Sequence, residues 1–173
     1  MTILRTPGDY QTLFMKAHGD IWWARSLQWS ATNWAVAILA GLSGVSKLLD
    51  ASDPGRSTAF AGRLQVATAI LGAVYIARLH YDVVHAQRSM HRIRLDHPGL
   101  QDPLSDQLPP HHTARNDLRG AIFPLALIMG ISIVLGLTSY GVSSNARWAV
   151  MAATGHLAVG ILSIGVARWR AAA

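Results

Sequence analysis

The stretch WAVMAATGHLAVGILSIGVA, from Trp148 to Ala167, decides the fold class of this chain. Its length matches the ~20 apolar residues that a helix needs to cross a lipid bilayer. It has no acidic or basic side chain, and its one titratable ring is His156, near its middle. Because an ionisable group at that depth is costly, the first question about function is what His156 contacts.

Three further runs have the same character, so the sequence predicts four transmembrane helices. The predicted spans are about 30–49, 60–79, 120–140 and 148–167. Of the 173 residues 51% are hydrophobic and only 14% are charged, against roughly 25% charged in soluble domains. The chain has a net charge of +6. In a membrane protein such an excess of basic residues usually lies in loops that face anionic lipid, so we do not interpret it as evidence for a nucleic-acid partner. We expect an all-α integral membrane protein with one domain over residues 1–173.

Turn-forming residues join the first span to the second and the third to the fourth, which predicts a four-transmembrane-helix bundle made of two hairpins. Between them lies a polar segment, about residues 80–119, whose first part continues the second helix to about Leu95. We expect the stretch 9–29 to form an N-terminal interfacial helix. It contains three residues typical of the headgroup region: Trp22, Trp23 and Trp29.

Basic residues are divided unequally between the two predicted sides of the membrane. Eleven lie in the N-terminal segment, the middle segment and the C-terminal tail: Arg5, Lys16, Arg25, Arg78, Arg88, Arg92, Arg94, Arg115, Arg119, Arg168 and Arg170. Four lie on the other side: Lys47, Arg56, Arg63 and Arg147. Because Lys and Arg gather on the cytoplasmic side, we expect a multi-pass protein of the inner (cytoplasmic) membrane with both termini in the cytoplasm. The first twenty residues lack the apolar core of a cleavable signal peptide.

Helical spacing gives each predicted span one stripe of small or mildly polar side chains, which we expect to face the bundle interior. The stripes are Asn33, Ala37, Ala40 and Gly44 in the first span; Gln65, Thr68, Gly72, Tyr75 and Leu79 in the second; Met129, Ser132, Gly136 and Ser139 in the third; and Ala149, Ala152, His156, Gly160, Ser163 and Ala167 in the fourth. This arrangement turns His156 toward the neighbouring helices and away from lipid.

Three roles are open to His156. The favoured role is a hydrogen bond to Tyr75, Thr68 or a backbone carbonyl of another helix, because intramembrane polar groups usually face such partners. The second role is a contact with a haem or a quinone. The third is a place in a proton relay.

Weaker candidates for cofactor contacts lie on the second helix. His80 and His85 are near the expected cytoplasmic end of the span, where they would meet a quinone headgroup or a soluble partner. Gln65 and Tyr75, on the inward stripe, complete the set. The favoured alternative for the two histidines is a solvated basic helix that contacts lipid phosphate.

Motifs for catalysis and metal binding are missing from the sequence. The chain has no Cys, which excludes disulfides, thiolate metal sites and a Cys nucleophile, and it has no Glu. The histidines of the middle segment do not have the spacing of a dedicated zinc site. We expect no catalytic residues and no metal site.

The order of these features resembles the membrane cytochrome b subunits of formate dehydrogenases (the gamma subunit) and of hydrogenases. Three stretches carry the resemblance: RSLQWSATNWAVAILAGLSG (25–44), ARNDLRGAIFPLALIMGISIVLGLTSYGV (114–142) and RWAVMAATGHLAVGILSIGVARW (147–169). The resemblance implies a membrane bundle that serves a redox complex. In that family four histidines hold two b haems.

The haem ligands of that family are mostly replaced in this chain. Gln28 and Gln65 stand near the first two ligand positions, His156 lies near the third, and Arg170 lies about where the fourth is expected. A bis-histidine haem needs two imidazoles at one depth, and His80 and His85 are expected to lie too far from His156 along the membrane normal. The resemblance therefore implies the fold of a membrane cytochrome more than its cofactors.

The sequence as a whole predicts a non-catalytic integral membrane subunit of a respiratory or dehydrogenase electron-transfer complex. It would anchor a partner, and a share in a quinone or haem b pocket stays open. One alternative is a single-haem b-type electron carrier that uses His156. A second alternative is an oligomeric membrane effector or channel. The expected partners are membrane lipids and other subunits of the redox complex.

Overall fold

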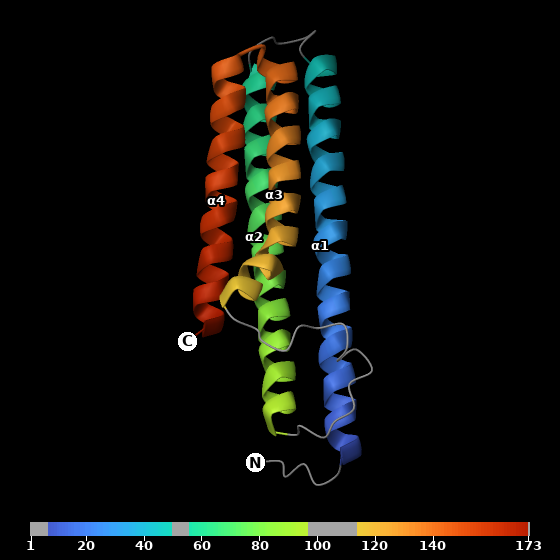
Figure 1. Ribbon diagram of the computed structural model, residues 1–173. Helices are drawn as coiled ribbons and strands as arrows, with labels where there is room; N and C mark the ends of the chain where they lie inside the picture. Colours follow the sequence, from blue (N-terminus) through green and yellow to red (C-terminus); the bar gives the residue numbers. More distant parts are fainter. Residues whose placement is uncertain (1–6, 50–55, 97–113, 173) are drawn as a thin grey trace.

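The computed structural model describes residues 7–49, 56–96 and 114–172, and within these ranges the chain forms four α-helices. They are α1 (Pro7–Leu49), α2 (Arg56–Asp96), α3 (Ala114–Ser143) and α4 (Ala146–Ala172). The helices pack lengthwise into an elongated bundle (Figure 1). Within the described ranges α2 and α3 each pack against all three other helices, whereas α1 and α4 do not pack together. Residues of α2 and α3 therefore dominate the centre of the bundle.

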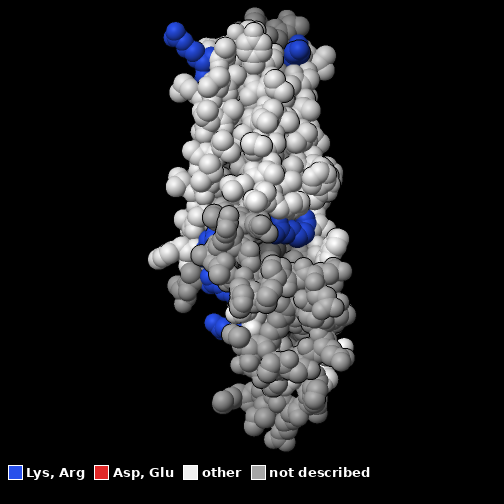
Figure 2. Space-filling view, in the orientation of Figure 1, with Lys and Arg blue, Asp and Glu red and all other residues white. Residues whose placement is uncertain are grey.

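Three of these helices are long and apolar enough to cross a membrane: α2 over Thr58–Ile93, α3 over Gly120–Ser143 and α4 over Ala146–Arg170. Only 28% to 39% of the most apolar part of each is buried in the bundle, and large apolar side chains such as Leu71, Leu137 and Leu162 are exposed. Figure 2 shows a band of surface without Lys or Arg between basic side chains at two heights. The all-α prediction is confirmed, and three of the four predicted spans lie in helices long and apolar enough to cross a membrane. In α1 the apolar stretch is interrupted by Asn33 and Lys47.

α1 is one continuous helix, so the prediction of an N-terminal interfacial helix distinct from the first span is wrong. Between Tyr10 and Ala40 the sequence has no proline and a single glycine, Gly19. No residue there ends the helix before the apolar stretch. The extension of α2 beyond the predicted span is confirmed as far as Asp96. The start of α1 and the end of α2, about residues 7–20 and 85–96, project beyond α4 as a two-helix stalk (Figure 1).

α1 and α2 pack together through buried side chains that repeat every three or four residues, the pattern of a coiled coil. On α1 they include Ala17, Ala24, Gln28, Ala35 and Leu39, and on α2 they include Ala69, Ala73, Ile76, His80 and Val83. Many of these residues are alanines, which lets the two backbones approach closely. A Cβ atom added at Gly72 would lie only 3.4 Å from Cβ of Ala35.

A two-residue connection joins α3 to α4. Ser144 has a left-handed conformation (φ 52°), and its N–H donates to the carbonyl of Tyr140 at 2.8 Å, which caps the end of α3. Asn145 then caps α4, because its side-chain oxygen accepts from the N–H of Trp148 at 3.2 Å. The two caps reverse the chain and place α4 beside α3.

The predicted inward stripes agree with the structure on α4 and fail on α1. On α4, Ala149, Ala152, His156, Gly160 and Ala167 are buried and Ser163 is half-buried. On α1 the four predicted residues, Asn33, Ala37, Ala40 and Gly44, are all exposed. The inward face is formed by Gln28, Thr32, Ala35 and Leu39. Two aromatic or long side chains assigned inward on other helices, Tyr75 and Met129, are also exposed.

Candidate functional site

Polar side chains inside the bundle form three layers along its length. The first layer contains Ser43, Gln65 and Ser139; the second contains Ser132 and His156; the third contains Arg25, Gln28 and His80. On α2 the first layer is level with Gln65, the second with Ala69 and the third with Ile76 to His80. At 1.5 Å per helical residue, Gln65 and Ala69 are about 6 Å apart along the helix, whereas Ala69 and His80 are about 16 Å apart. The third layer is therefore well separated from the first two.

His156 of α4 links three helices in the second layer. Its Nε2 lies 2.9 Å from the carbonyl oxygen of Ala69 on α2, and its Nδ1 lies 2.7 Å from Oγ of Ser132 on α3. A carbonyl only accepts, so Nε2 donates to Ala69. In the neutral ring Nδ1 can only accept, so it shares the single hydroxyl proton of Ser132 with the Ile128 carbonyl, whose oxygen lies 2.8 Å from Oγ of Ser132. Both ring nitrogens are therefore occupied by protein groups. Of the hydrogen-bond partners predicted for His156, the structure has a backbone carbonyl, that of Ala69. Neither Tyr75 nor Thr68 is its partner.

A serine hydroxyl beside a histidine is the arrangement of a nucleophile and its general base. Here, however, the Ser132–His156 pair lies buried between helices. The two residues are only 4% and 3% exposed, so a substrate has no access to them in this conformation. The Nε2 atom is held by a backbone carbonyl, which leaves no second proton acceptor for a relay. The pair instead fastens α4 to the two central helices.

The first layer fastens α1 to α2 and α3 through Gln65. The amide nitrogen of Gln65 donates to Oγ of Ser43 at 2.9 Å, and Oγ of Ser139 donates to the amide oxygen at 3.4 Å. Gln65 is fully buried and uses both ends of its amide in this way. It is a structural link between three helices.

The third layer contains buried polar atoms without protein partners. The amide nitrogen of Gln28 on α1 donates to the carbonyl of Ile76 on α2 at 3.0 Å. The amide oxygen of Gln28 and both ring nitrogens of His80 are buried and make no hydrogen bond to any described residue. His80 is 1% exposed, so these nitrogens are not open to solvent. Such atoms are rare in folded proteins. Here they belong to three residues on two facing helices, because Nη1 of Arg25 on α1 is also buried without a partner among the described residues.

Arg25 completes the third layer by satisfying a carbonyl that a proline frees. Pro124 has no N–H, so the carbonyl of Gly120, four residues earlier, loses its partner inside α3. The Nη2 atom of Arg25 donates to that carbonyl at 3.3 Å, and the guanidinium lies 4.7 Å from the centre of the Phe123 ring. Burial lowers the pKa of Arg25 from its ordinary value, because desolvation disfavours the charged form. Figure 1 shows the first turns of α3 at an angle to the rest of the helix.

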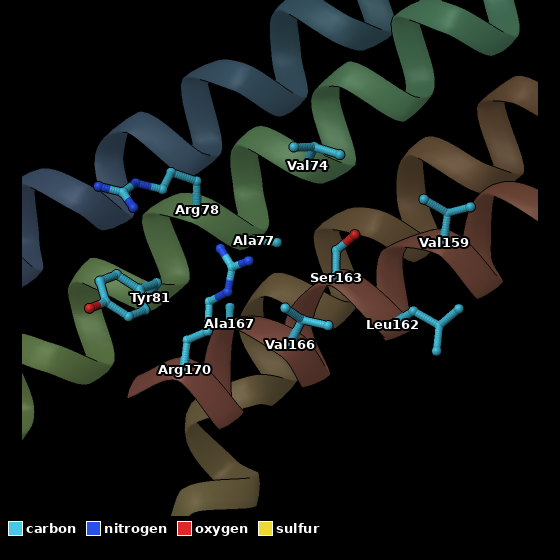
Figure 3. Close-up of a pocket in the computed structure, with 10 residues that line it drawn as sticks. All are labelled: Val74, Ala77, Arg78, Tyr81, Val159, Leu162, Ser163, Val166, Ala167 and Arg170. Carbon is cyan, nitrogen blue, oxygen red and sulfur yellow. The ribbon is translucent and has the colours of Figure 1, made fainter. Parts of the chain in front are cut away.

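A groove of about 560 Å³ lies on the surface between α2 and α4, outside the three layers (Figure 3). Its apolar lining is Val74, Ala77, Val159, Leu162, Val166 and Ala167, with Ser163 among them. One end is polar and carries Arg78, Tyr81 and Arg170. The guanidinium carbon of Arg78 lies 5.4 Å from the Tyr81 ring centre, and its Nη2 atom lies 3.9 Å from Oδ1 of Asp82.

The five predicted cofactor contacts do not come together. Gln65, His156 and His80 lie in three different layers, Tyr75 is 47% exposed on the outer face, and His85 is exposed beside Tyr81 with ring centres 6.2 Å apart. The sequence analysis missed the α2–α4 groove, because it interpreted Arg78 and Arg170 as cytoplasmic charges and Arg170 also as the residue at the fourth haem-ligand position. The feature of the sequence that could have indicated this groove is the position of the two arginines close to the small residues Ala77 and Ala167.

The side chains in these layers do not fit the b haems that membrane cytochrome b subunits hold. A b haem needs a free imidazole nitrogen on each axial ligand. Those of His156 are engaged, and His80, whose nitrogens have no partner among the described residues, lies about 16 Å from the His156 level. Within residues 7–49, 56–96 and 114–172, no group of three His, Cys, Asp or Glu side chains is arranged to hold a metal ion.

No family model, no curated protein and no solved structure matches this chain.

Proposed function

We propose that the chain is a non-catalytic integral membrane subunit that anchors a redox partner as part of a respiratory or dehydrogenase complex. The redox character of the partner comes from the resemblance of residues 25–44, 114–142 and 147–169 to membrane cytochrome b subunits. In this proposal α1 is the fourth span, over about residues 30–49, and the four spans form two hairpins. The division of eleven against four basic residues favours the inner membrane with both termini in the cytoplasm.

The observation that carries the proposal is the outward face of α1. Asn33, Ala37, Ala40 and Gly44 form a stripe along the helix and are exposed. Nothing lies within 4 Å of a Cβ atom added at Gly41 or Gly44. A lipid-facing surface does not need small side chains, and an exposed amide at Asn33 is costly in hydrocarbon, whereas a neighbouring helix uses both. We infer that a transmembrane helix of another subunit covers this stripe.

The stalk supports the anchoring role. It extends the α1–α2 coiled coil beyond α4 and carries exposed side chains of mixed character, such as Met15 and Arg92. The side chains of Gln65, Ser132 and His156 favour a structural role over catalysis, because all three form hydrogen bonds between helices.

Affinity purification from native membranes in mild detergent tests the proposal. We expect a stoichiometric partner whose redox centres are reduced by dithionite. The double variant Ala40→Leu with Gly44→Leu should lose this partner, because bulky side chains block close approach on α1. The matched control is Gly141→Leu with Gly165→Leu, at exposed positions that likewise have no atom within 4 Å of an added Cβ.

The same stripe would serve a second copy of the chain, which is the oligomeric alternative. A purified complex that contains only this chain, as a defined ring, would favour the oligomer and contradict the subunit proposal. A stoichiometric b-type absorption band in the isolated chain would instead favour the single-haem carrier.

A further inference from the structure

We propose that the α2–α4 groove is a binding site for one anionic phospholipid. The inference needs only that α2 and α4 lie in the membrane, and both belong to the three helices long and apolar enough to cross it. It does not depend on the redox partner proposed above.

The groove exists because small residues form its floor and larger ones its walls. Ala77, Ser163 and Ala167 lie between the two helices, while Val74, Leu162 and Val166 stand at the sides (Figure 3). Ala77 and Ala167 are buried, whereas Leu162 is 69% exposed. The result is an apolar channel that is open toward the surrounding lipid.

The length of the groove matches one acyl chain in one leaflet. On α4 the lining runs from Val159 to Arg170, which is about 16 Å at 1.5 Å per residue. Half of the ~30 Å hydrocarbon core is about 15 Å. An acyl chain that lies along Val159, Leu162 and Val166 would therefore place its headgroup at the level of Arg170.

The polar end supplies the charge that a phosphate needs. Arg78 and Arg170 come from different helices and both line the groove, and Arg170 reaches from α4 toward α2 in Figure 3. The contact of Arg78 with Asp82 is long, at 3.9 Å, and exposed, so it leaves the guanidinium able to bind another anion. Trp169, 71% exposed next to Arg170, is typical of the headgroup level. Basic pockets between membrane helices bind anionic headgroups in this way.

The combination of one apolar channel with two guanidinium groups selects the occupant. A neutral quinone would use the channel but not the two positive charges. A free phosphate would use the charges but not the channel. A phospholipid with a net negative headgroup uses both.

Native mass spectrometry of the detergent-purified full chain, combined with thermal unfolding, tests the site. The probes are phosphatidylglycerol and phosphatidylcholine with the same acyl chains, glycerol phosphate without chains, and a short-chain quinone. We expect one phosphatidylglycerol to be retained and to raise the unfolding temperature, with phosphatidylcholine bound more weakly and glycerol phosphate without effect.

Two variants separate the parts of the site. Arg78→Gln with Arg170→Gln should weaken phosphatidylglycerol binding about tenfold or more, since each basic residue contributes to headgroup attraction. Ser163→Leu should abolish binding by filling the floor while it leaves both charges in place. The matched control, Arg63→Gln with Arg147→Gln, removes two exposed arginines near the opposite end of the bundle and should bind as the wild type does.

Three results would overturn the assignment. Equal retention of phosphatidylcholine and phosphatidylglycerol would remove the role of the arginines. An equal loss in the control variant would mean that net charge alone attracts lipid. Stabilisation by the quinone, without stabilisation by phosphatidylglycerol, would assign the groove to a different ligand.

Discussion

Two buried histidines occupy opposite chemical situations in this molecule. His156 has both ring nitrogens hydrogen-bonded, to Ala69 and Ser132, whereas neither ring nitrogen of His80 has a partner among the described residues. Both are nearly inaccessible, at 3% and 1% exposure. The stability of the protein should therefore respond in opposite directions to the same substitution at the two positions.

We predict that His156→Leu lowers the free energy of unfolding in detergent by about 1–2 kcal/mol, because two interhelical hydrogen bonds are lost. His156→Gln should cost less than about 1 kcal/mol, since an amide can still donate to Ala69 and accept from Ser132. His80→Leu should raise stability by about 1 kcal/mol, because it removes buried unpaired nitrogens. Denaturant unfolding of the three variants measures this. A loss above about 3 kcal/mol in His156→Gln, or a loss in His80→Leu, would reveal a ligand role for that histidine.

Glycines on α4 differ in what surrounds them, and this gives a second prediction at the residue scale. A Cβ atom at Gly160 would collide with Ile128 of α3, whereas nothing lies within 4 Å at Gly155. Gly160→Ala should therefore destabilise the protein by about 1–3 kcal/mol, and Ile128→Ala should reduce that loss when combined with it. Gly155→Ala should be neutral or stabilising by up to about 1 kcal/mol. Thermal unfolding of the series decides, and equal effects at the two glycines would contradict the packing of α3 on α4.

At the scale of elements, the sequence predicts where the apolar helices lie better than it predicts how they face. The runs 60–79, 120–140 and 148–167 all fall inside helices apolar enough to cross a membrane. The inward face of α4 followed from small residues around His156, because a buried imidazole must turn toward partners. The inward face of α1 did not follow, because lipid is as apolar as the bundle core and gives no contrast between the two sides of a span. The sequence analysis placed Asn33 in the interior, but the buried polar side chain on this part of α1 is Gln28.

Sequence patterns could not predict the α2–α4 groove or the contact of Arg25 with the Gly120 carbonyl, and the reason is a different one. Each depends on residues from separate helices, such as Arg78 with Arg170 or Arg25 with Gly120. Helical periodicity places residues on one helix and carries no information about the register between helices.

The interaction of Arg25 with α3 gives a prediction at the same scale. Pro124 frees the Gly120 carbonyl that Arg25 then binds. In the wild type, Arg25→Gln should cost about 1–2 kcal/mol of stability, since a charged donor is lost from a buried acceptor. In a Pro124→Ala background the cost should fall by about 1 kcal/mol, because the restored N–H of residue 124 satisfies the carbonyl. Unfolding of the four proteins in a double-mutant cycle measures the difference, and a coupling energy near zero would contradict this account of the bent α3.

At the scale of the whole molecule, the structure combines a membrane bundle with a stalk built from the two longest helices. α1 has 43 residues and α2 has 41, whereas α3 and α4 have 30 and 27. The extra turns of α1 and α2 continue their pairing past the end of α4, and in the proposed function this stalk is a surface for the partner. In the same proposal the small-residue stripe on the outside of α1 is a second contact with the partner, inside the bilayer. Both contacts require that α1 itself crosses the membrane.

Site-specific labelling with an impermeant maleimide tests that requirement most directly, and the absence of native cysteine makes single-cysteine variants simple to read. Gln11→Cys, Lys47→Cys and Asn145→Cys all place the thiol at an exposed position. We predict that Gln11→Cys reacts only from the cytoplasmic side, and that Lys47→Cys and Asn145→Cys react only from the opposite side. Labelling of Gln11→Cys and Lys47→Cys from the same side would mean that α1 does not span the membrane, and would contradict the four-span bundle.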